Sequence, residues 1–406
     1  MNTLSFIGLL REIFRKEKPD LNRIVEKGLL AVKIGQMFAL RVDFLKPETC
    51  AHLGRLYQHN PELPSGDFFN LLSRTVNEGW RDAFEMIEDK PLATASVAQV
   101  HRGRLNIAGT GHDVVIKLIK ADVADQFQRD VEHVLRLFRF IIFFYPKLRR
   151  VANPLALLEM IRQDTLAELD LLNEMKHQAI LRGIVDKYGR EVDLKGLGFP
   201  RMFPDYCNSR VLVMEEIQGP SINDLLERGA LDYSLLLRLF HLHGFYIFGT
   251  GIFHGDIHPG NILLQDGIFY FIDCGALARV SERLRSGLFH FMKNLAWYRF
   301  DKCAECLHRM SEKTIDPERF LAFRRRLLDL YEDFPGKTVS QISLTRQMMY
   351  TIRLGVDYGM EFGEGMFPVI KSLMYLDGMI LRCNPDAVLM EDMRANVAEL
   401  EPYVTH

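Results

Sequence analysis

Several features are missing from this chain of 406 residues, and each absence excludes a class of protein. No stretch reaches the ~20 consecutive apolar residues that a membrane-spanning helix needs. Neither sign of charge dominates, since 51 Lys and Arg oppose 53 Asp and Glu, so the bulk charge gives no reason to expect a nucleic-acid partner. Internal repeats and low-complexity segments are also missing. With 48% hydrophobic residues, the chain has enough apolar surface for a large folded core.

Cysteines are few and scattered, and no secretory signal precedes them. The six thiols therefore predict a reduced, cytosolic compartment. Cys303 and Cys306 form a C-x-x-C pair, but a zinc site needs four ligands and no second pair accompanies them. We expect two thiols in a helix.

The order of periodic segments predicts an α+β protein. Apolar residues at helical spacing predict helices over 20–58, 66–87, 123–140, 153–184 and 233–250 and from 281 onward. Alternating apolar residues predict a β-hairpin from 97–105 and 113–120, a strand over 210–217 and two short strands around "QDG". This is the layout of a two-lobed, protein-kinase-like fold, with a small β-containing N-lobe and a mostly helical C-lobe. The predicted domains are an N-terminal helical extension (1–88), the N-lobe (89–214) and the C-lobe (215–406).

The stretch "HGDIHPGN" concentrates polar and loop-forming residues ahead of a short apolar run. Asp256 and Asn261 stand five positions apart, the Asp-to-Asn spacing of a kinase catalytic loop. Asp256 would orient an acceptor hydroxyl or take its proton, and Asn261 would hold Mg²⁺. We expect His254 to support the loop through a hydrogen bond. Twelve residues after Asn261, "FIDCG" places Asp273 at a strand end as a second Mg²⁺ ligand.

A lysine and an acidic helix precede this loop in the order that phosphoryl transfer requires. Lys117, in "VVIKLIK", lies on the second strand of the hairpin and would reach a nucleotide under the turn. "LAELDLLNEM" offers Glu168, Asp170 and Glu174. Because Glu168 and Glu174 are six residues apart, they do not share one helical face. One should pair with Lys117 while another does separate work, and the spacing does not decide between them.

Glycine is missing where an ordinary protein kinase needs it. G-x-G-x-x-G should precede the lysine strand, but the chain has "PLATASVAQVH" instead. Alanine does not readily adopt the positive φ angles that glycine allows, so this loop should be stiffer. Its backbone N–H groups and hydroxyls would contact phosphates. The candidate nucleotide-binding residues in and beyond this loop are Ala93, Thr94, Ala95, Ser96, Val97, Glu215 and Ile217.

These pieces together resemble the UbiB (aarF-domain) family of atypical kinases. The matching segments are "KIGQ" (33–36), the alanine-rich loop, "VVIK", "ELD", "HGDIHPGN", "IDCG" and "KSLMYLDGMILRCNPD" (371–386). The resemblance implies a kinase-like fold with the helical extension over the active site, binding of Mg²⁺ with ATP or ADP, and an ATPase or unorthodox kinase activity. By position, it also implies that Lys33 and Gln36 enter the active site from the extension.

The resemblance also implies a role in the metabolism of ubiquinone or other isoprenoid lipids. Its possible partners are anionic lipid, a quinone precursor and ubiquinone-biosynthesis proteins. The chain lacks the terminal membrane helices of many bacterial members. We expect it to be cytoplasmic or peripheral on the inner membrane surface, through the basic and apolar segments 1–18 and 134–150. Two alternatives stay open: a phosphotransferase for a choline- or aminoglycoside-like alcohol, and a nucleotide-dependent scaffold that binds lipid.

Overall fold

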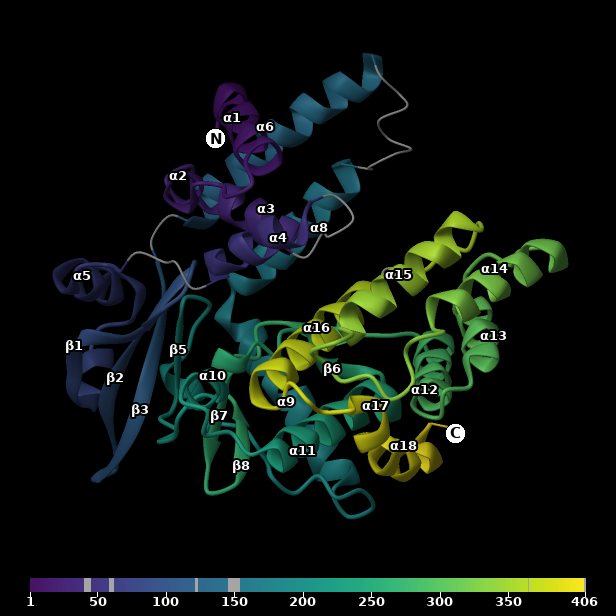
Figure 1. Cartoon of the computed structure of the whole chain (residues 1–406). Helices are drawn as coiled ribbons and strands as arrows, with labels where there is room; N and C mark the ends of the chain where they lie inside the picture. The colour runs from purple at the N-terminus through teal and green to yellow at the C-terminus, as the bar shows by residue number, and fades with distance from the viewer. Residues whose placement is uncertain (40–44, 58–61, 121–122, 145–153, 364, 405–406) are drawn as a thin grey trace. The chain divides into compact units, whose positions relative to one another are not determined.

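The computed structural model describes residues 1–404 except 40–44, 58–61, 121–122, 145–153 and 364 (Figure 1). The chain forms two compact units. Unit 1 comprises Met1–Lys176 and Pro200–Glu216, and unit 2 comprises His177–Phe199 and Ile217–His406. Unit 1 combines N-terminal helices with a β-sheet, and unit 2 is mostly helical. The predicted α+β, kinase-like fold class is therefore confirmed.

The sheet of unit 1 is antiparallel, in the order β1-β2-β3-β5. Its strands are β1 (Phe84–Thr94), β2 (Ala98–Ile107), β3 (Thr110–Ile119) and β5 (Val211–Glu215). The hairpin expected between 97 and 120 is present. Its turn uses positive φ at Ala108 (50°) and Gly109 (84°), the combination that a tight two-residue hairpin turn needs. The register pairs Lys117 of β3 with Val100 of β2 and with Leu212 of β5.

The helix predicted over 66–87 is wrong beyond Thr75. Helix α5 spans Ser65–Thr75, Gly79 then takes a left-handed φ of 80°, a 3₁₀ turn η2 covers Trp80–Ala83, and β1 begins at Phe84. The apolar spacing of this stretch suits a helix, but pairing with β2 determines its structure. Such tertiary pairing overrides local propensity.

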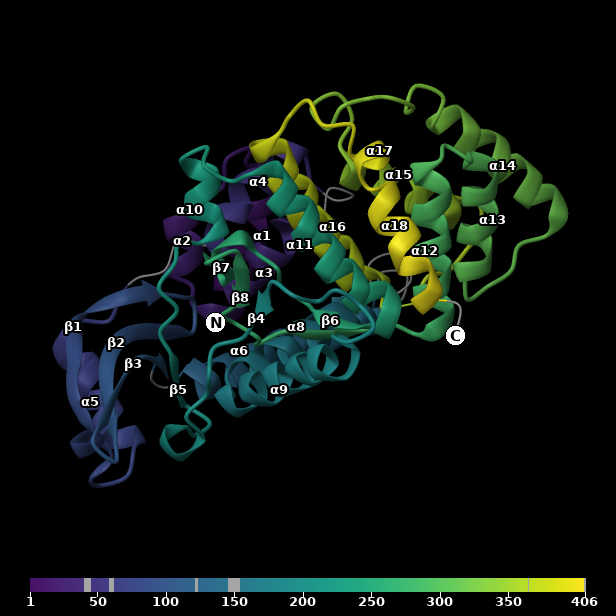
Figure 2. The same cartoon turned by 90° about the horizontal axis from the view of Figure 1, so that it is seen from below.

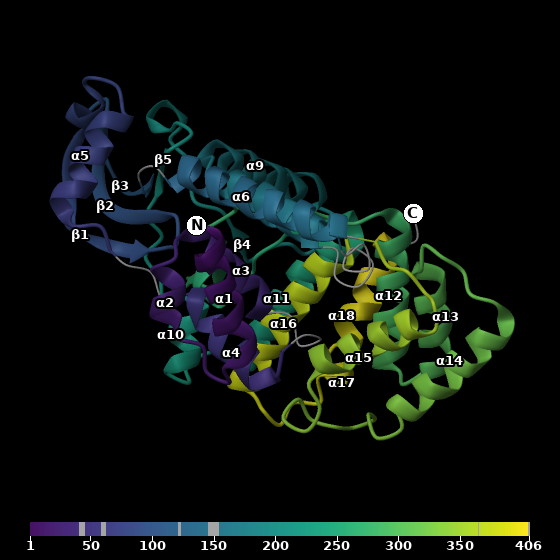
Figure 3. The ribbon, with the colours of Figure 1, turned by 90° about the horizontal axis from the view of Figure 1, so that it is seen from above.

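Most remaining elements of unit 1 are helices around one apolar core that includes Phe6, Leu30 and Phe127. The predicted helix over 20–58 is divided into shorter helices, with Gly28 (φ 94°) at the first break. The elements are α1 (Thr3–Arg15), α2 (Leu21–Val25), α3 (Leu29–Ala39), α4 (Pro47–Gly54), η1 (Arg55–Tyr57), α6 (Val123–Phe144), α8 (Pro154–Glu168) and, between strands, η3 (Pro204–Tyr206). Helix α1 packs on α3 and α6, and α3 packs on α4 (Figure 3).

Unit 2 contains two small sheets. One has the order β4-β8-β7, from β4 (Leu197–Gly198), β7 (Ile262–Gln265) and β8 (Ile268–Phe271). The other pairs β6 (Ile252–His254) with β9 (Leu277–Arg279). The turn at "QDG" has positive φ at Asp266 and Gly267. These strands carry the segments on either side of "HGDIHPGN" and "IDCG".

Helices form the rest of unit 2 around a large apolar core (Figure 2). Helix α9 (Leu171–Tyr188) begins in unit 1 and ends in unit 2. The others are α10 (Ile222–Glu227), α11 (Tyr233–Gly244), the π-helical η4 (Phe245–Thr250), η5 (Pro259–Asn261), α12 (Glu282–Ala296), α13 (Phe300–Met310), α14 (Pro317–Leu330), α15 (Leu344–Asp357), α16 (Met366–Cys383), α17 (Leu389–Asp392), α18 (Arg394–Leu400) and η6 (Glu401–Tyr403).

Two expectations about these helices can be compared with the structure. The predicted helix over 233–250 is α-helical only to Gly244 and continues as a π-helix, which ends at Gly251 with a φ of 72°. Cys303 and Cys306 are buried thiols of α13, as expected. No described helix is both long and apolar enough to cross a bilayer.

A buried carboxylate holds the start of α15. Asp377 of α16 is 8% exposed and accepts hydrogen bonds from Ser343 Oγ (2.7 Å) and from the backbone N–H groups of Leu344 (3.2 Å) and Thr345 (3.2 Å). Asp377 of α16 therefore caps the N-terminus of α15, although α15 comes earlier in the sequence.

We expect Asp377→Ala to lower the free energy of unfolding by about 2–4 kcal/mol, because it leaves these donors without their acceptor. Urea denaturation monitored by circular dichroism measures the change. The control is Asp386→Ala, which removes an exposed carboxylate two residues after Asn384 and should change the midpoint little. Equal midpoints for the two variants would contradict this role of Asp377.

Candidate active site

Lys117 and Glu174 form a buried ion pair in unit 1. Lys117 Nζ lies 2.7 Å from Glu174 Oε2, and the two side chains are 10% and 3% exposed. Strand β3 provides the lysine and the first turns of α9 provide the glutamate. Removing one partner of such a pair leaves an uncompensated buried charge. The sequence left open whether Glu168 or Glu174 pairs with Lys117, and the structure pairs it with Glu174.

Glu168 instead contacts Lys33, so the extension reaches the acidic segment directly. The ion pair joins α3 to the end of α8, both within unit 1. Gln36, one turn after Lys33, is buried and donates from Nε2 to Leu56 O at 3.2 Å. Asp170 accepts from the Leu172 N–H at 3.1 Å and stabilises the start of α9. The "KIGQ" and "ELD" segments therefore meet through one pair, Lys33–Glu168.

The alanine-rich loop is a tight turn between β1 and β2. Ala93 and Thr94 are still in the ladder, opposite Val100 and Gln99. The Ala95 N–H donates to Ala98 O at 2.8 Å and closes the turn that contains Ser96 and Val97. Thr94 Oγ1 is buried and has no hydrogen-bond partner among the described residues.

A second lysine, Lys120, holds this turn in place. Its Nζ donates to Ala95 O (2.9 Å), its backbone N–H donates to Val97 O (2.9 Å), and the residue is 9% exposed. No local pattern marks Lys120 as a site residue, because it is the last residue of an ordinary β-run and its partner is 25 positions earlier. Lys120 thus provides a polar restraint at a loop whose alanines lack the freedom of glycine.

The end of β5 carries the two remaining candidates. Glu215 is exposed, and its Oε2 accepts from the Arg201 N–H at 3.0 Å. Ile217 is 9% exposed and is the first residue of the second segment of unit 2. Neither makes a contact that assigns it to a nucleotide, so both stay predictions.

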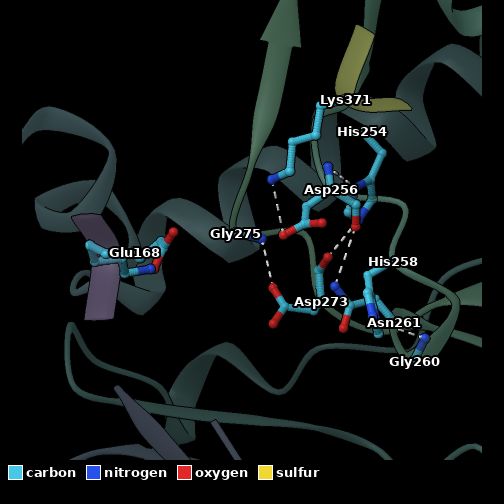
Figure 4. Close-up of polar contacts among 10 residues, drawn as sticks. Glu168, His254, Asp256, His258, Gly260, Asn261, Asp273, Gly275 and Lys371 are labelled. Atoms are coloured by element: carbon cyan, nitrogen blue, oxygen red, sulfur yellow. Dashed lines mark hydrogen bonds and ion pairs between the residues drawn. The ribbon is translucent and has the colours of Figure 1, made fainter. Parts of the chain in front are cut away.

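The loop of unit 2 is organised by His254 (Figure 4). Its Nε2 donates to Asp273 O at 2.5 Å, and its Nδ1 accepts from the Asp256 N–H at 3.0 Å. Burial lowers the pKa of this imidazole, which stays neutral and can serve as donor and acceptor at once. His254 therefore connects the "HGD" and "IDCG" segments, in agreement with the supporting role expected for it.

Asp256 has a cationic partner that the sequence did not reveal. Lys371 Nζ of α16 lies 3.3 Å from Asp256 Oδ2, with side-chain exposures of 18% and 28% (Figure 4). Burial acts to raise the pKa of Asp256, but the positive charge of Lys371 outweighs it and holds the pKa below its usual value. Asp256 is thus an ionised carboxylate whose position is fixed on one side by Lys371.

Asn261 and Asp273 present oxygen atoms from adjoining segments. The backbone joins them where the Ile272 N–H donates to Asn261 O at 3.1 Å. Asn261 Nδ2 donates to Asp256 O at 3.3 Å, which leaves the amide oxygen as the atom suited to a metal. Asp273 Oδ1 accepts from the Gly275 N–H at 3.0 Å.

This donor set fits Mg²⁺. Among the described residues, no group of three or more His, Cys, Asp or Glu side chains forms a preassembled metal site. Mg²⁺ does not require one, because it usually takes one or two protein oxygens and completes its shell with water and substrate phosphates. An amide oxygen from Asn261 and a carboxylate from Asp273 match that pattern.

A pH effect follows from the burial of Lys120. Burial lowers the pKa of Lys120 to about 8, although Glu62 acts to raise it, while an unfolded lysine has a pKa of about 10.4. Between these values the unfolded chain binds the proton and the folded chain does not, so this lysine makes stability rise with pH.

Lys120→Met removes the effect. We expect the free energy of unfolding of the wild type, relative to the variant, to increase by about 2 kcal/mol from pH 7 to pH 10. Urea unfolding at several pH values measures it, and parallel curves would contradict it.

Comparisons with known proteins agree with this arrangement. The model of the ABC1 atypical kinase-like domain matches residues 55–307. An uncharacterized aarF domain-containing protein kinase, chloroplastic, of Arabidopsis thaliana is 24% identical over 97% of this chain and 75% of its own. The probable protein kinases UbiB of Actinobacillus pleuropneumoniae serotype 7 and Cronobacter sakazakii are 26% and 29% identical over 87% of this chain, which spans 65% of their length.

A solved structure supports the fold independently. The complex of Rv3197 with erythromycin, from Mycobacterium tuberculosis, superposes with a TM-score of 0.58 at 18% identity, over 92% of this chain and 91% of that chain. The family model covers more than half of the sequence, including the alanine-rich loop, Lys117, the acidic segment and both loops of unit 2. The chain therefore belongs to the ABC1 (aarF-domain, UbiB) family of atypical kinases.

Proposed function

We propose that the protein is a magnesium- and ATP-dependent phosphotransferase or ATPase of the UbiB type. The observation that carries the proposal is the buried Lys117–Glu174 ion pair between β3 and α9. Kinases use such a lysine to bind nucleotide phosphates and a helix glutamate to orient it. The alternative reading of Lys117 as an exposed strand residue does not apply to a side chain that is 10% exposed.

In this proposal, each set of residues has a separate task. Lys117, oriented by Glu174, binds phosphate oxygens, and the turn at Ala95–Ala98 covers them with backbone N–H groups. Asn261 and Asp273 would hold Mg²⁺, which neutralises charge on the phosphates when bound. Asp256 orients the attacking oxygen, either of an acceptor hydroxyl or of water. Because its pKa is lowered, Asp256 is better suited to orienting the nucleophile than to taking its proton early in the reaction.

The extension would limit the acceptor. Lys33 of α3 pairs with Glu168, next to the segment that supplies Glu174. We infer that this contact holds the extension at the nucleotide-binding side and excludes a protein substrate. It favours the UbiB-type activity over a choline- or aminoglycoside-kinase-like activity, which has no use for such an extension.

We further propose that the enzyme serves ubiquinone or isoprenoid-lipid metabolism at a membrane surface. Helix α1 exposes Leu4 (80%), Ile7 (40%) and Phe14 (45%), together with Arg11. Phe140 of α6 is 65% exposed, while residues 145–150 of the second predicted surface segment lie outside the described residues. Apolar and basic side chains on one helix suit an interfacial position. The lipid class itself is what the resemblance to the UbiB family implies.

The first experiment compares Asp273→Asn with Asp266→Asn. The change at Asp273 removes a metal carboxylate and should reduce Mg²⁺-dependent phosphate release from ATP by a factor on the order of a hundred or more. The change at Asp266 makes the same substitution in a tight turn (φ 52°) that asparagine tolerates, and it should leave turnover unaltered. Circular dichroism verifies folding. Undiminished turnover in folded Asp273→Asn would contradict the proposal.

A second experiment examines Lys371. Lys371→Met leaves Asp256 without its cation and should lower kcat by about tenfold or more, with little change in KM for ATP. Lys371→Arg keeps the charge and should restore most of the activity. Lys302→Met, which removes an exposed lysine paired with Glu305, serves as the control. If kcat of Lys371→Met were the same as kcat of Lys302→Met, the Lys371–Asp256 pair would have no part in turnover.

A third experiment addresses the lipid role. Turnover is measured with and without anionic liposomes and isoprenoid-quinone precursors, and a lipid-dependent rise is the expected result. Rapid phosphorylation of a soluble alcohol would favour the small-molecule kinase instead. Tight ATP or ADP binding without turnover under any lipid would favour the scaffold.

A further inference from the structure

The N-terminal extension contains a polar cavity of about 530 Å³, which lies within unit 1. It is lined by Lys18, Pro19, Asp20, Leu21, Asn22, His52 and Arg55. A volume of this size is in the range of small-molecule sites. None of its lining residues belongs to the catalytic groups described above.

Two cations of the lining, Lys18 and Arg55, outnumber its one carboxylate, Asp20. Lys18 and Arg55 are exposed and form no ion pair with any residue that the structure describes. Three neighbouring cations are paired: Lys16 with Glu12 at 2.7 Å, Arg23 with Asp20 at 3.5 Å, and Lys46 with Glu17 at 2.6 Å. Asp20, the acidic residue of the lining, is therefore matched by Arg23, and the cavity keeps an excess of positive charge.

The wall of the cavity is fixed before any ligand arrives. Three contacts hold residues 17–20 against α1 and α4, and a fourth joins them to α2. Thr49 Oγ1 donates to Glu17 O (3.1 Å), His52 Nε2 bonds Pro19 O (2.8 Å), the Asp20 N–H donates to Glu12 Oε1 (2.7 Å), and Asp20 caps α2. A preorganised site loses less entropy on binding than a mobile one. Lys18 and Arg55 therefore stand on a rigid frame that can receive an anion between them.

We propose that this cavity is a binding site for a phosphate group, held between Lys18 and Arg55. The guanidinium of Arg55 can donate two hydrogen bonds to phosphate oxygens, and Lys18 adds a compact charge. His52 lines the same cavity and already uses Nε2 on Pro19 O. The phosphate can come from a soluble molecule or from a phospholipid headgroup. Lys18 lies three residues after the end of α1, the helix proposed above to contact a membrane surface, so a phospholipid headgroup is one source that the test includes.

The site deepens the proposed membrane association, and it stands apart from phosphoryl transfer. Its test therefore measures binding alone and uses no turnover. A negative result would leave the proposed ATPase or kinase activity untouched, and a catalytically dead protein could still bind phosphate here.

The experiment uses the full chain in two double variants of equal charge. Lys18→Gln with Arg55→Gln removes both cavity cations, and Arg15→Gln with Lys46→Gln removes two exposed neighbouring cations that are outside the lining and pair with no lining residue. Calorimetric titration with inorganic phosphate in chloride of matched ionic strength is one arm. Sedimentation with phosphatidylcholine vesicles, with and without phosphatidylglycerol, is the other. Circular dichroism verifies that both variants fold.

We expect the cavity variant to bind about thirtyfold more weakly than the wild type, at roughly fivefold for each basic residue, and the neighbouring variant to bind nearly as the wild type. Saturable binding of inorganic phosphate would show that a free phosphate ion binds the site without a lipid. Binding to anionic vesicles alone identifies the headgroup, and Leu4→Ser with Ile7→Ser should then weaken vesicle binding. Equal losses in the two double variants would mean diffuse attraction and would overturn the proposal, as would a wild type that binds neither probe.

Discussion

The pair of Lys117 and Glu174 is the constraint on which the first unit depends. Neither charge is stable at this depth without the other, so the ion pair ties β3 to the beginning of α9. The same contact brings the acidic segment next to the extension, where Lys33 meets Glu168. One buried ion pair therefore connects the sheet, the acidic helix and, through the adjoining pair, the N-terminal helices.

In the second unit, several polar groups of "HGDIHPGN" are held in a loop with little regular structure. A neutral imidazole at His254 does this with one donated and one accepted hydrogen bond, and it joins the segments that carry Asp256 and Asp273. Burial, which keeps the ring uncharged, is what allows both bonds to form. Lys371 then balances the charge of Asp256 from a helix more than a hundred residues later.

The alanine-rich loop shows how a family can replace one physical solution with another. Glycine gives a phosphate-covering loop freedom of φ and close approach of the backbone. Here the turn is closed by Ala95 N–H and by two bonds from Lys120, so rigidity replaces freedom. A turn fixed in this way holds its backbone N–H groups in one arrangement.

The sequence by itself determined the elements whose signals are local. The turn at Asp266–Gly267 has two residues that accept positive φ, and the order of lysine, acidic helix, "HGDIHPGN" and "IDCG" predicted the class of site. Tertiary structure alone decided that β1 is a strand, because its pairing with β2 outweighs a helical apolar pattern. It also decided that Glu174 pairs with Lys117, and that Lys120 and Lys371 contact Ala95 and Asp256. Each of these contacts joins residues far apart in the chain, and no local spacing encodes which distant carboxylate or carbonyl a lysine will reach once the core has packed.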